Sequence, residues 1–387
     1  MVSGQYRTYL TYRTYTTDHR LTMRILQISS ASSFGGGERH VVDLSDALQS
    51  RGHEVYVALR PESPLPKHLH VPARNIKTLP LRNALDAQSA QGLARIVKQN
   101  EIEVVHAHMA RDYSLAAYAA HSYPKPKFFV TRHVLFPLNR LHRRTLSKTT
   151  KVIAVSEAVA KQLSEQQLVP EEKIAIVPNG IDVDRFANAC TKFDRAAFLR
   201  SRDLPFDCLL VASIGELRKL KRHDDLIRAT QLVHREVPKL QVVIAGVDTS
   251  PNGENRRALI DLLNQLKLSN QVQLVGWLDD ADQLFCAADV FVSASETESF
   301  GLSIAEAMAA GTAVVATRTE GAQEVVKDRS TGLLVPIGDV ERLAMSIIQL
   351  LKNTEERTRL AKQAAAEARS RFSLTRMVDE MEKLYSG

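Results

Sequence analysis

Short runs rich in Val and Ile alternate with amphipathic helical stretches along this chain of 387 residues, and this alternation constrains the fold most. RILQIS, EVVHAH and KVIAVS are such runs in the first half, and CLLVASIG, QVVIAG and VFVSAS in the second. Apolar strands separated by helices are typical of parallel sheets that helices cover on both faces. Two such blocks, separated by the polar region 188–207, predict two doubly wound α/β domains.

The pattern also indicates where the domains begin and end. The first 22 residues are rich in Tyr, Arg and Thr and lack the apolar segment of a signal peptide. We interpret residues 1–22 as a disordered leader or a misread start upstream of Met23. We expect a first domain at 23–187 and a second at 188–372.

Composition excludes several classes of protein. Hydrophobic residues make up 44% of the chain and charged residues 25%, which is the balance of a folded globular protein. No apolar run approaches the roughly 18 to 20 residues that a membrane-spanning helix needs. The three cysteines, Cys190, Cys208 and Cys286, form no C-x-x-C pair. We therefore expect separate thiols in a reducing cytoplasm, not a zinc cage or a disulfide framework.

The net charge of +7 is unevenly distributed. No Asp or Glu lies between Asp112 and Glu157, and this stretch carries a set of cations from Lys125 to Lys151. Its field attracts anions, so anionic lipid, a phosphorylated acceptor or nucleic acid could bind there. A merely solvated face carries equal weight. Nucleic acid is the weakest alternative, because no nucleic-acid-binding module accompanies the charge.

In open parallel sheets, ligands bind at the carboxyl ends of the strands. The segment FGGGERH, 34–40, follows the first strand and opens a helix. Its glycines let the backbone approach a ligand closely, and the N–H groups at the helix start favour phosphate. A tight turn without a ligand is the alternative.

His106 and His108 end the strand EVVHAH, and strand alternation puts both on one face. Such a pair can bind metal, but no matching carboxylate or cysteine cluster is evident. We expect His108, which lies nearer the end of the strand, to contact a ligand, and His106 to be structural.

The turn GELRKLKRHDD, 215–225, follows the first strand of the second block. Four cations crowd this helix start, where they oppose the helix dipole, so something anionic must offset them. They are Arg218, Lys219, Lys221 and Arg222. Fixed cations here can stabilise the charge of a departing diphosphate.

Glu298 and Glu306 are the strongest pair of candidate site residues. Glu298 lies in the loop after VFVSA, and Glu306 lies in the helix that begins near Gly301 or Leu302. Carboxylates accept hydrogen bonds from sugar hydroxyls well. A cap for Glu298 and a surface position for Glu306 are the alternatives. Glu306 interrupts the apolar run IAEAMAAG, which argues against simple exposure.

ESFGLSIAE, followed by AMAAGTAVVAT, resembles the E-x(7)-E signature of the family 4 glycosyltransferases of the GT-B fold. The Gly-rich block, HAH, VIAVSEAVAKQL, VPNGIDVDRF and TGLLVP follow in the order of that family. The resemblance covers nearly all of 23–387, and the motifs are specific when taken together.

The resemblance implies two Rossmann-like domains that face each other across a cleft, with the final helix, 373–387, packed back on the first domain. It implies transfer of a sugar from a UDP- or GDP-sugar to a hydroxyl acceptor, with retention of configuration and with neither metal nor cofactor. A lipid-linked or cell-envelope glycan fits as acceptor. The expected location is the cytoplasm, at the inner face of the membrane through 125–151, with no nucleic-acid partner.

The resemblance also assigns roles to residues. Glu298 contacts the donor sugar, His108 the transferred sugar, Glu306 the nucleotide ribose and Lys221 the diphosphate. The resemblance also places Gly36 and Gly37 near phosphate or the acceptor. We add as candidate donor contacts Arg218, Phe300, Gly301, Leu302 and Gly321.

Three positions depart from the family pattern. Glu216 stands where Arg is common, Arg222 where Gly is common, and Glu320 where a second Gly is usual. We hypothesise that Arg218 supplies the missing guanidinium.

Other functions of the same fold remain open. They are a nucleotide-sugar epimerase, a phosphorylase-like enzyme, which would need a pyridoxal-phosphate lysine that no motif places, and a non-catalytic nucleotide-sugar-binding scaffold. The D-V-D of Asp182 and Asp184 resembles a metal-binding D-x-D, but we interpret it as interdomain structure. The donor base and sugar, the acceptor, the linkage and the oligomeric state are not predicted.

Overall fold

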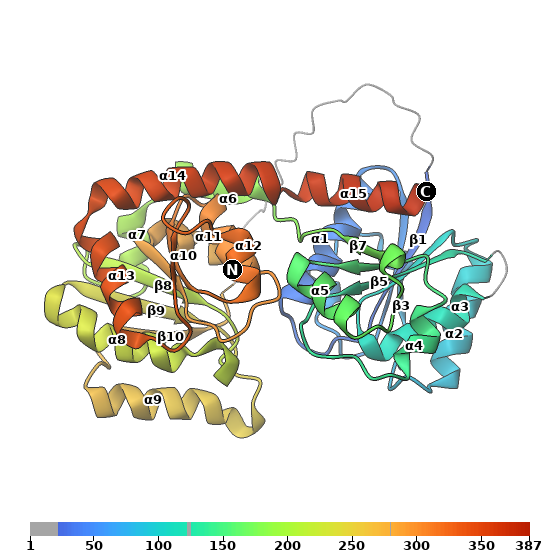
Figure 1. The fold of residues 1–387 in the computed structure, drawn as a ribbon, viewed down its shortest axis with the longest axis horizontal. Coiled ribbons are helices and arrows are strands. Elements are labelled where there is room, and N and C mark those ends of the chain that lie inside the picture. The colour runs from blue at the N-terminus through green and yellow to red at the C-terminus, as the bar shows by residue number, and fades with distance from the viewer. Residues whose placement is uncertain (1–21, 122–124, 279) are drawn as a thin grey trace, which may run out of the picture.

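A computed structural model of the chain describes residues 22–121, 125–278 and 280–387 (Figure 1). Almost all of the predicted leader, residues 1–21, lies outside this part of the chain. The described residues form two parallel α/β domains, each built on its own sheet. The two doubly wound domains expected from the alternating pattern are therefore present.

The first sheet has the strand order β3-β2-β1-β4-β5-β6-β7, and all its pairings are parallel. Its strands are β1 (Arg24–Ser29), β2 (Glu54–Leu59), β3 (Ile76–Thr78), β4 (Val104–Ala107), β5 (Lys127–Arg132), β6 (Lys151–Ala154) and β7 (Ile174–Ile176). The connecting α-helices are α1 (Gly36–Ser50), α2 (Ala87–Gln99), α3 (Tyr113–Ala120), α4 (His142–Leu146) and α5 (Glu157–Glu165).

The second sheet has the order β10-β9-β8-β11-β12-β13 and is also parallel. Its strands are β8 (Leu209–Ile214), β9 (Leu240–Ala245), β10 (Val272–Gly276), β11 (Val290–Ser293), β12 (Ala313–Thr317) and β13 (Leu333–Val335). The remaining α-helices are α6 (Val183–Thr191), α7 (Arg195–Ser201), α8 (His223–Glu236), α9 (Glu254–Leu266), α10 (Ala281–Ala287), α11 (Leu302–Ala309), α12 (Glu320–Val325), α13 (Val340–Lys352), α14 (Thr354–Arg371) and α15 (Leu374–Ser386).

The central strands are apolar on both faces because helices cover both faces. Successive residues of β1, from Ile25 to Ile28, are fully buried, although their side chains alternate between the two faces. The opposite faces of β1 belong to different apolar clusters, one of which includes residues of α1 and α15. This double burial is the physical reason that the strands read as continuous Val/Ile-rich runs.

The last helix, α15, packs against α1 of the first domain, although α14 before it packs against α11 of the second (Figure 1). Arg51 donates to Asp379 and Glu382 over 2.6 and 2.9 Å. The Nε2 of His53 lies 3.0 Å from the carboxylate of Glu382. The C-terminal helices therefore tie the two domains together. The exact domain boundary near 187 and 188 stays a prediction.

Several short elements were not expected from the sequence. The edge strand β3 lies in the Pro-rich segment 61–80, whose sequence shows no strand pattern, and α7 lies in the polar region 188–207. The segment TEGAQEV, whose sequence shows no helical period, contains α12, and Thr319 caps this helix by accepting from Ala322 N–H. Helices and strands this short carry too few residues to show a period.

The expectation of three separate thiols is wrong. Cys190 on α6 and Cys286 on α10 form a disulfide with a Cα–Cα distance of 5.1 Å, and only Cys208 is free and buried. The two paired residues are 96 positions apart. Their spacing could not reveal the pair, because α6 and α10 become neighbours only in the folded domain.

None of the helices within 22–121, 125–278 and 280–387 is both long enough and apolar enough to cross a membrane.

Candidate active site

Each sheet reverses its strand order once, between β1 and β4 in the first domain and between β8 and β11 in the second. At such a reversal, the loops after the two central strands diverge and leave room for a ligand. The Gly-rich loop follows β1 and His108 follows β4, whereas the basic turn follows β8 and Glu298 follows β11. The sequence-predicted residues thus lie at both reversal points.

The loops at the two reversal points face each other. We call those of the first domain the first edge and those of the second domain the second edge. A Cβ on Gly36 would lie 3.0 Å from Cδ1 of Leu302, and a Cβ on Gly35 would lie 3.4 Å from Oε1 of Glu216. The rings of Phe34 and Trp277 meet edge to face with centroids 5.5 Å apart. The Gly-rich loop of the first domain therefore lies against the helix start and the basic turn of the second.

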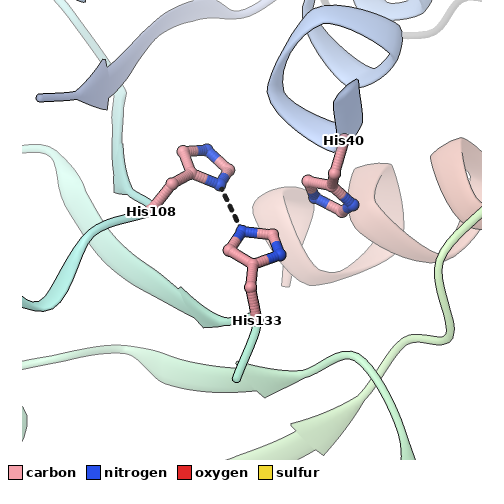
Figure 2. A group of neighbouring side chains, drawn as sticks. All are labelled: His40, His108 and His133. Carbon is pink, nitrogen blue, oxygen red and sulfur yellow. Dashed lines mark hydrogen bonds between the residues drawn. The ribbon is translucent and has the colours of Figure 1, made fainter. Parts of the chain in front are cut away.

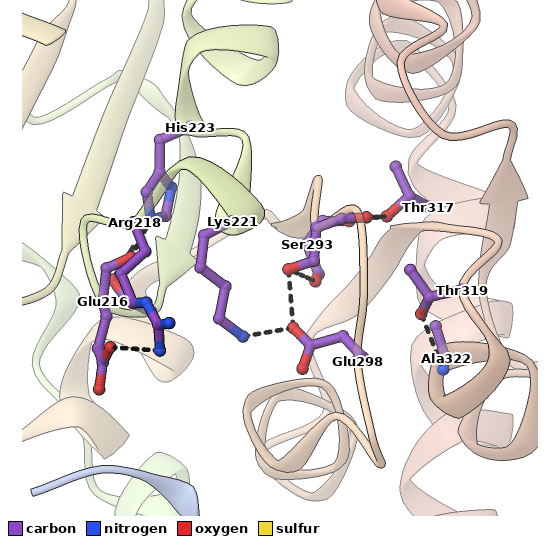
Figure 3. A network of polar contacts seen from close by, with 11 residues as sticks. Glu216, Arg218, Lys221, His223, Ser293, Glu298, Thr317, Thr319 and Ala322 are labelled. Carbon is purple, nitrogen blue, oxygen red and sulfur yellow. Dashed lines mark hydrogen bonds and ion pairs between the residues drawn. The ribbon is translucent and has the colours of Figure 1, made fainter. Parts of the chain in front are cut away.

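Lys221 and Glu298 are paired at the centre of the second edge (Figure 3). The Nζ of Lys221 donates to Oε1 of Glu298 over 2.6 Å, and the hydroxyl of Ser295 donates to the same oxygen over 2.7 Å. The side chain of Glu298 is 11% exposed and that of Lys221 is 27% exposed. A partly buried pair of this kind presents one cation and one acceptor to a ligand.

Arg218 and Arg222 of the basic turn also have carboxylate partners. Arg218 lies 3.5 Å from Glu216, and Arg222 lies 2.6 Å from Asp225 and 3.6 Å from Glu296. For these residues, the anionic groups expected to offset the cations at the helix start are thus carboxylates of the protein itself.

Arg222 follows the 3₁₀ turn Lys219–Lys221 and adopts a left-handed conformation with φ 46° and ψ 42°. This explains why Gly is common at this position in the family, because a side chain there costs about 1 to 2 kcal/mol. The ion pair between Arg222 and Asp225, of which the aspartate is buried, offsets part of that cost.

The turn before α11 brings a helix N-terminus to the facing edge. Gly301 has φ 97°, which a glycine adopts without strain, and α11 begins at Leu302 beside Gly36. The side chain of Phe300 is instead buried against Phe372, so only its backbone is available to a donor.

Gly321 lies directly behind the loop that carries Glu298. A Cβ there would lie 2.6 Å from the carbonyl oxygen of Glu298 and from the amide nitrogen of Phe300. Gly321 N–H also donates to that carbonyl over 3.1 Å. The structure therefore gives Gly321 a packing role in positioning the Glu298 loop.

Glu306 is surrounded by charges from other helices. Burial raises the pKa of its carboxyl to about 7, Arg39 and Arg185 lower it, and Asp43 and Asp282 raise it further. The structure therefore groups Glu306 with α1, α6 and α10. A carboxyl with this pKa can donate as well as accept a hydrogen bond near neutral pH.

The helix start after the Gly-rich loop has no side-chain cap, because its N-cap residue is Gly35. Glu38 Oε2 accepts from Gly35 N–H over 3.0 Å, which occupies one backbone donor of the loop. Gly37 would place a Cβ 3.5 Å from the ring of His133. The first N–H groups of α1 thus remain uncapped by side chains of the described residues, as a phosphate site requires.

His106 lies within β4 and His108 directly follows it. Both ring nitrogens of His106 are hydrogen-bonded inside the protein, to Tyr385 Oη and Thr131 Oγ1. Both nitrogens of His108 also have partners, with Nε2 2.7 Å from Gln27 Oε1 and Nδ1 3.2 Å from His133 Nε2 (Figure 2). The contact of His108 with a ligand stays a prediction.

His40 and His133 complete this group, and sequence reasoning did not single them out. His40 belongs to the quoted FGGGERH motif, and His133 directly follows the strand KFFVTR, as His108 follows its own strand. That shared position after a parallel strand was the available signal for His133.

The D-V-D segment has internal partners. Asp182 caps α6 by accepting from Arg185 N–H over 3.0 Å, and Asp184 lies 3.2 Å from Arg369 of α14. These contacts account for both carboxylates.

Family models and proteins of known activity match most of this chain in sequence. The family model described as Glycosyl transferases group 1 matches residues 195–367, and the one described as Glycosyltransferase Family 4 matches residues 34–185. The lipopolysaccharide core biosynthesis glycosyltransferase LpsE of Rhizobium meliloti (strain 1021) is 30% identical over 353 residues, covering 89% of this chain and 94% of LpsE. The N-acetyl-alpha-D-glucosaminyl L-malate synthase of Bacillus anthracis is 26% identical over 92% of this chain and 95% of that protein.

Solved structures show the same fold. A glycosyltransferase from Rickettsia africae ESF-5 aligns with a TM-score of 0.84 and 24% identity over 95% of this chain and 98% of that one. Anabaena Alr3699/HepE in complex with UDP-glucose aligns with a TM-score of 0.82 and 22% identity over 94% of this chain and 99% of that one. Both consist of the two-domain GT-B architecture.

The raised pKa of Glu306 predicts how stability depends on pH. The ordinary value is 4.5 and the folded value is about 7, so between them the folded protein binds a proton that the unfolded chain releases. The free energy of unfolding therefore falls as pH rises through this range. Glu306→Gln should remove this contribution, so that its stability relative to the wild type increases from about pH 5 to about pH 8 in urea unfolding. Parallel pH profiles for the two proteins would contradict the buried, protonated carboxyl.

Proposed function

Because the chain belongs to the group 1, family 4 glycosyltransferases of the GT-B fold, we propose that it transfers a sugar from UDP-sugar to a hydroxyl acceptor with retention of configuration. The observation that carries this proposal is the pair of Lys221 and Glu298, which faces the Gly-rich loop across the two reversal points. A GDP-sugar is the alternative donor.

The chemistry of transfer matches these groups. The bond between the anomeric carbon of the sugar and the diphosphate oxygen breaks, and negative charge grows on the departing diphosphate. Lys221 and the N-terminus of α11 at Leu302 lie where such charge can be stabilised. Glu298 then accepts hydrogen bonds from the hydroxyls of the donor sugar, and this orients the anomeric carbon.

The second edge also offers contacts to the nucleotide part of the donor. Arg218, Lys219 and Ser250 line a cavity of about 430 Å³ beside the basic turn. We assign this cavity to part of the nucleotide. Arg218 supplies the guanidinium that the family usually has at the position of Glu216. UDP is favoured as the nucleotide because the HepE structure, which shares the fold, contains UDP-glucose.

In this proposal the diphosphate is neutralised by side chains and backbone N–H groups, so transfer needs no metal. Glu306 contacts the ribose, and His108 contacts the transferred sugar from the opposite edge. Support comes from the positions of Lys221 and Leu302 on one side and His108 on the other.

The donor is tested by thermal unfolding of the protein with UDP-, GDP- and ADP-sugars, each in the presence of EDTA. We expect UDP-sugars to raise Tm most, because a ligand at about 100 times its Kd stabilises the folded state by about 2.7 kcal/mol. A dominant shift with ADP-sugars, or shifts that require a divalent cation, would overturn the proposed donor or the metal-free transfer.

The diphosphate contacts are tested by turnover of the donor identified in that panel. Lys221→Met should lower kcat by about 10²- to 10³-fold, as expected for the loss of one donor that stabilises developing charge. Arg218→Ala should cause a smaller loss, because its side chain is half exposed.

Lys239→Ala is the matched control, because Lys239 pairs with Asp207 on the surface of the same domain. Unchanged turnover in Arg218→Ala would refute the role of Arg218 and leave that of Lys221 standing.

The acceptor is proposed to be a lipid-linked or cell-envelope glycan, reached at the inner face of the membrane. LpsE, the relative described above, is a lipopolysaccharide core enzyme. Within 125–151, Lys127, Arg132 and Lys151 donate to backbone carbonyls, so they are structural. The remaining cations are exposed and make no ion pair among the described residues, and they are Lys125, Arg140, Arg143, Arg144 and Lys148.

Exposed apolar side chains accompany these cations. Phe136 is 53% exposed and Leu141 is 82% exposed, on the segment that leads into α4. Cations that attract anionic headgroups, beside apolar side chains that enter the interface, favour a membrane surface over a merely solvated face.

Vesicle sedimentation tests this attachment. The protein should bind vesicles containing anionic lipid in a salt-sensitive manner, and Arg143→Ala/Arg144→Ala or Leu141→Ser should weaken binding several-fold. Met345→Ser, which changes an apolar residue on α13 that is 67% exposed, should have no effect. Equal binding to neutral vesicles, or binding that is insensitive to these changes, would argue against the membrane site.

A further inference from the structure

Three histidines from separate elements converge at the facing edge of the first domain (Figure 2). His40 comes from α1, His108 follows β4 and His133 follows β5. One ring nitrogen from each lies within 4.8 Å of the other two. His40 and His108 are 2% and 4% exposed, and His133 is partly exposed, so two of the three imidazoles are buried.

Hydrogen bonds on the outer side of the group orient two of the rings. His40 Nδ1 lies 2.8 Å from Asn179 Oδ1, and His108 Nε2 lies 2.7 Å from Gln27 Oε1. An amide oxygen only accepts, so each of these ring nitrogens carries the proton. The inner nitrogens, His40 Nε2 and His108 Nδ1, therefore carry lone pairs that face the centre of the group.

The inner side of the group is short of partners. His40 Nε2 is buried and has no hydrogen-bond partner among the described residues; His133 Nδ1, the nitrogen of that ring that does not face His108, also has none. His108 Nδ1 and His133 Nε2 lie 3.2 Å apart. Two imidazoles on one tetrahedral zinc ion at about 2.0 to 2.1 Å have nitrogens separated by roughly 3.3 Å. The separation thus already suits two ligands of one ion.

Burial also keeps the three rings neutral. It lowers the pKa of His40 to about 4, and it lowers the pKa values of His108 and His133 well below the ordinary value. A neutral imidazole is the form that binds metal, so no net deprotonation opposes binding at neutral pH. His133 need only move its proton from Nε2 to Nδ1.

We propose that His40, His108 and His133 form a three-imidazole site for Zn²⁺ or a similar transition-metal ion, and that the bound ion blocks sugar transfer. Three imidazoles leave one tetrahedral position open to water or a substrate oxygen. Gln27 and Asn179 act as the outer partners that fix ligand orientation. The inhibition rests on the proposed function, because His108 there contacts the transferred sugar; metal binding itself does not.

Metal binding is measured on the full chain without a histidine tag, after EDTA treatment and dialysis. We expect one Co²⁺ per chain, with the intense visible absorption of tetrahedral Co²⁺, and its displacement by Zn²⁺. Mg²⁺, which prefers oxygen ligands, should not compete. Absence of a tetrahedral Co²⁺ spectrum, or full competition by Mg²⁺, would overturn the site.

The ligands are tested with His40→Gln and His133→Gln, each of which should abolish the tetrahedral spectrum. His121→Gln is the matched control, because His121 lies at the end of α3 and bonds to Ala117 O. Thermal melting checks that each variant is folded, and the partly exposed His133 provides the variant less prone to misfold. An unchanged spectrum in either folded variant refutes the site.

A substitution of Gln27, which orients His108 without being a ligand, distinguishes a site with oriented ligands from adventitious metal binding. Gln27→Leu removes the acceptor for His108 Nε2 without removing a ligand, and it should weaken Co²⁺ affinity by about 10- to 100-fold. Unchanged affinity would mean that His108 is not a ligand in the orientation described.

Inhibition is then measured as donor turnover at increasing Zn²⁺, with and without EDTA. Zn²⁺ should inhibit competitively with the nucleotide sugar in the wild type, and His40→Gln should be resistant. If one ion binds but turnover is unaffected, the blocking role fails and the metal site stands. If the protein never turns over donor, the proposed function fails, and the Co²⁺ spectrum still decides the metal site.

Discussion

In a doubly wound parallel sheet, helices cover both faces, so polar side chains can gather only at the ends of the strands. The reversal of strand order between β1 and β4, and between β8 and β11, selects one place on each sheet. Here the two places face each other, as the contact of Gly36 with Leu302 shows. Every residue to which we assign a role in transfer derives its position from this pairing of edges or from the helices that begin there.

Three of the four cations of the basic turn have a carboxylate partner before any ligand binds. Lys221 is held by Glu298, Arg218 by Glu216 and Arg222 by Asp225. If a diphosphate binds at this edge, as we propose, it competes with Glu298 for Lys221, and the second carboxylate oxygen of Glu298 is left to accept from a sugar hydroxyl.

The periodicity and motif order of the sequence predicted the two sheets, the α11 start and the positions of Glu298 and His108, because each depends on local pattern. They could not predict the disulfide of Cys190 with Cys286, the pairing of Glu306 with charges on α1, or the approach of His40 to His133. Each of these joins elements that only tertiary packing brings together. Phe300 illustrates the converse, since the motif marks its position but cannot tell a buried side chain from one that faces a ligand.

Contacts away from the site set how the two edges meet. Glu324 of α12 accepts from the backbone N–H groups of Glu157 and Ala158 over 2.9 and 2.7 Å, at the start of α5 in the other domain. A carboxylate at a helix N-terminus is stabilised by the helix dipole, so this contact joins the domains without a buried cation. The packing of α15 against α1 is a second contact between the domains. A change at either contact should therefore alter the spacing between the Gly-rich loop and Lys221, although neither contact includes a residue to which we assign a substrate.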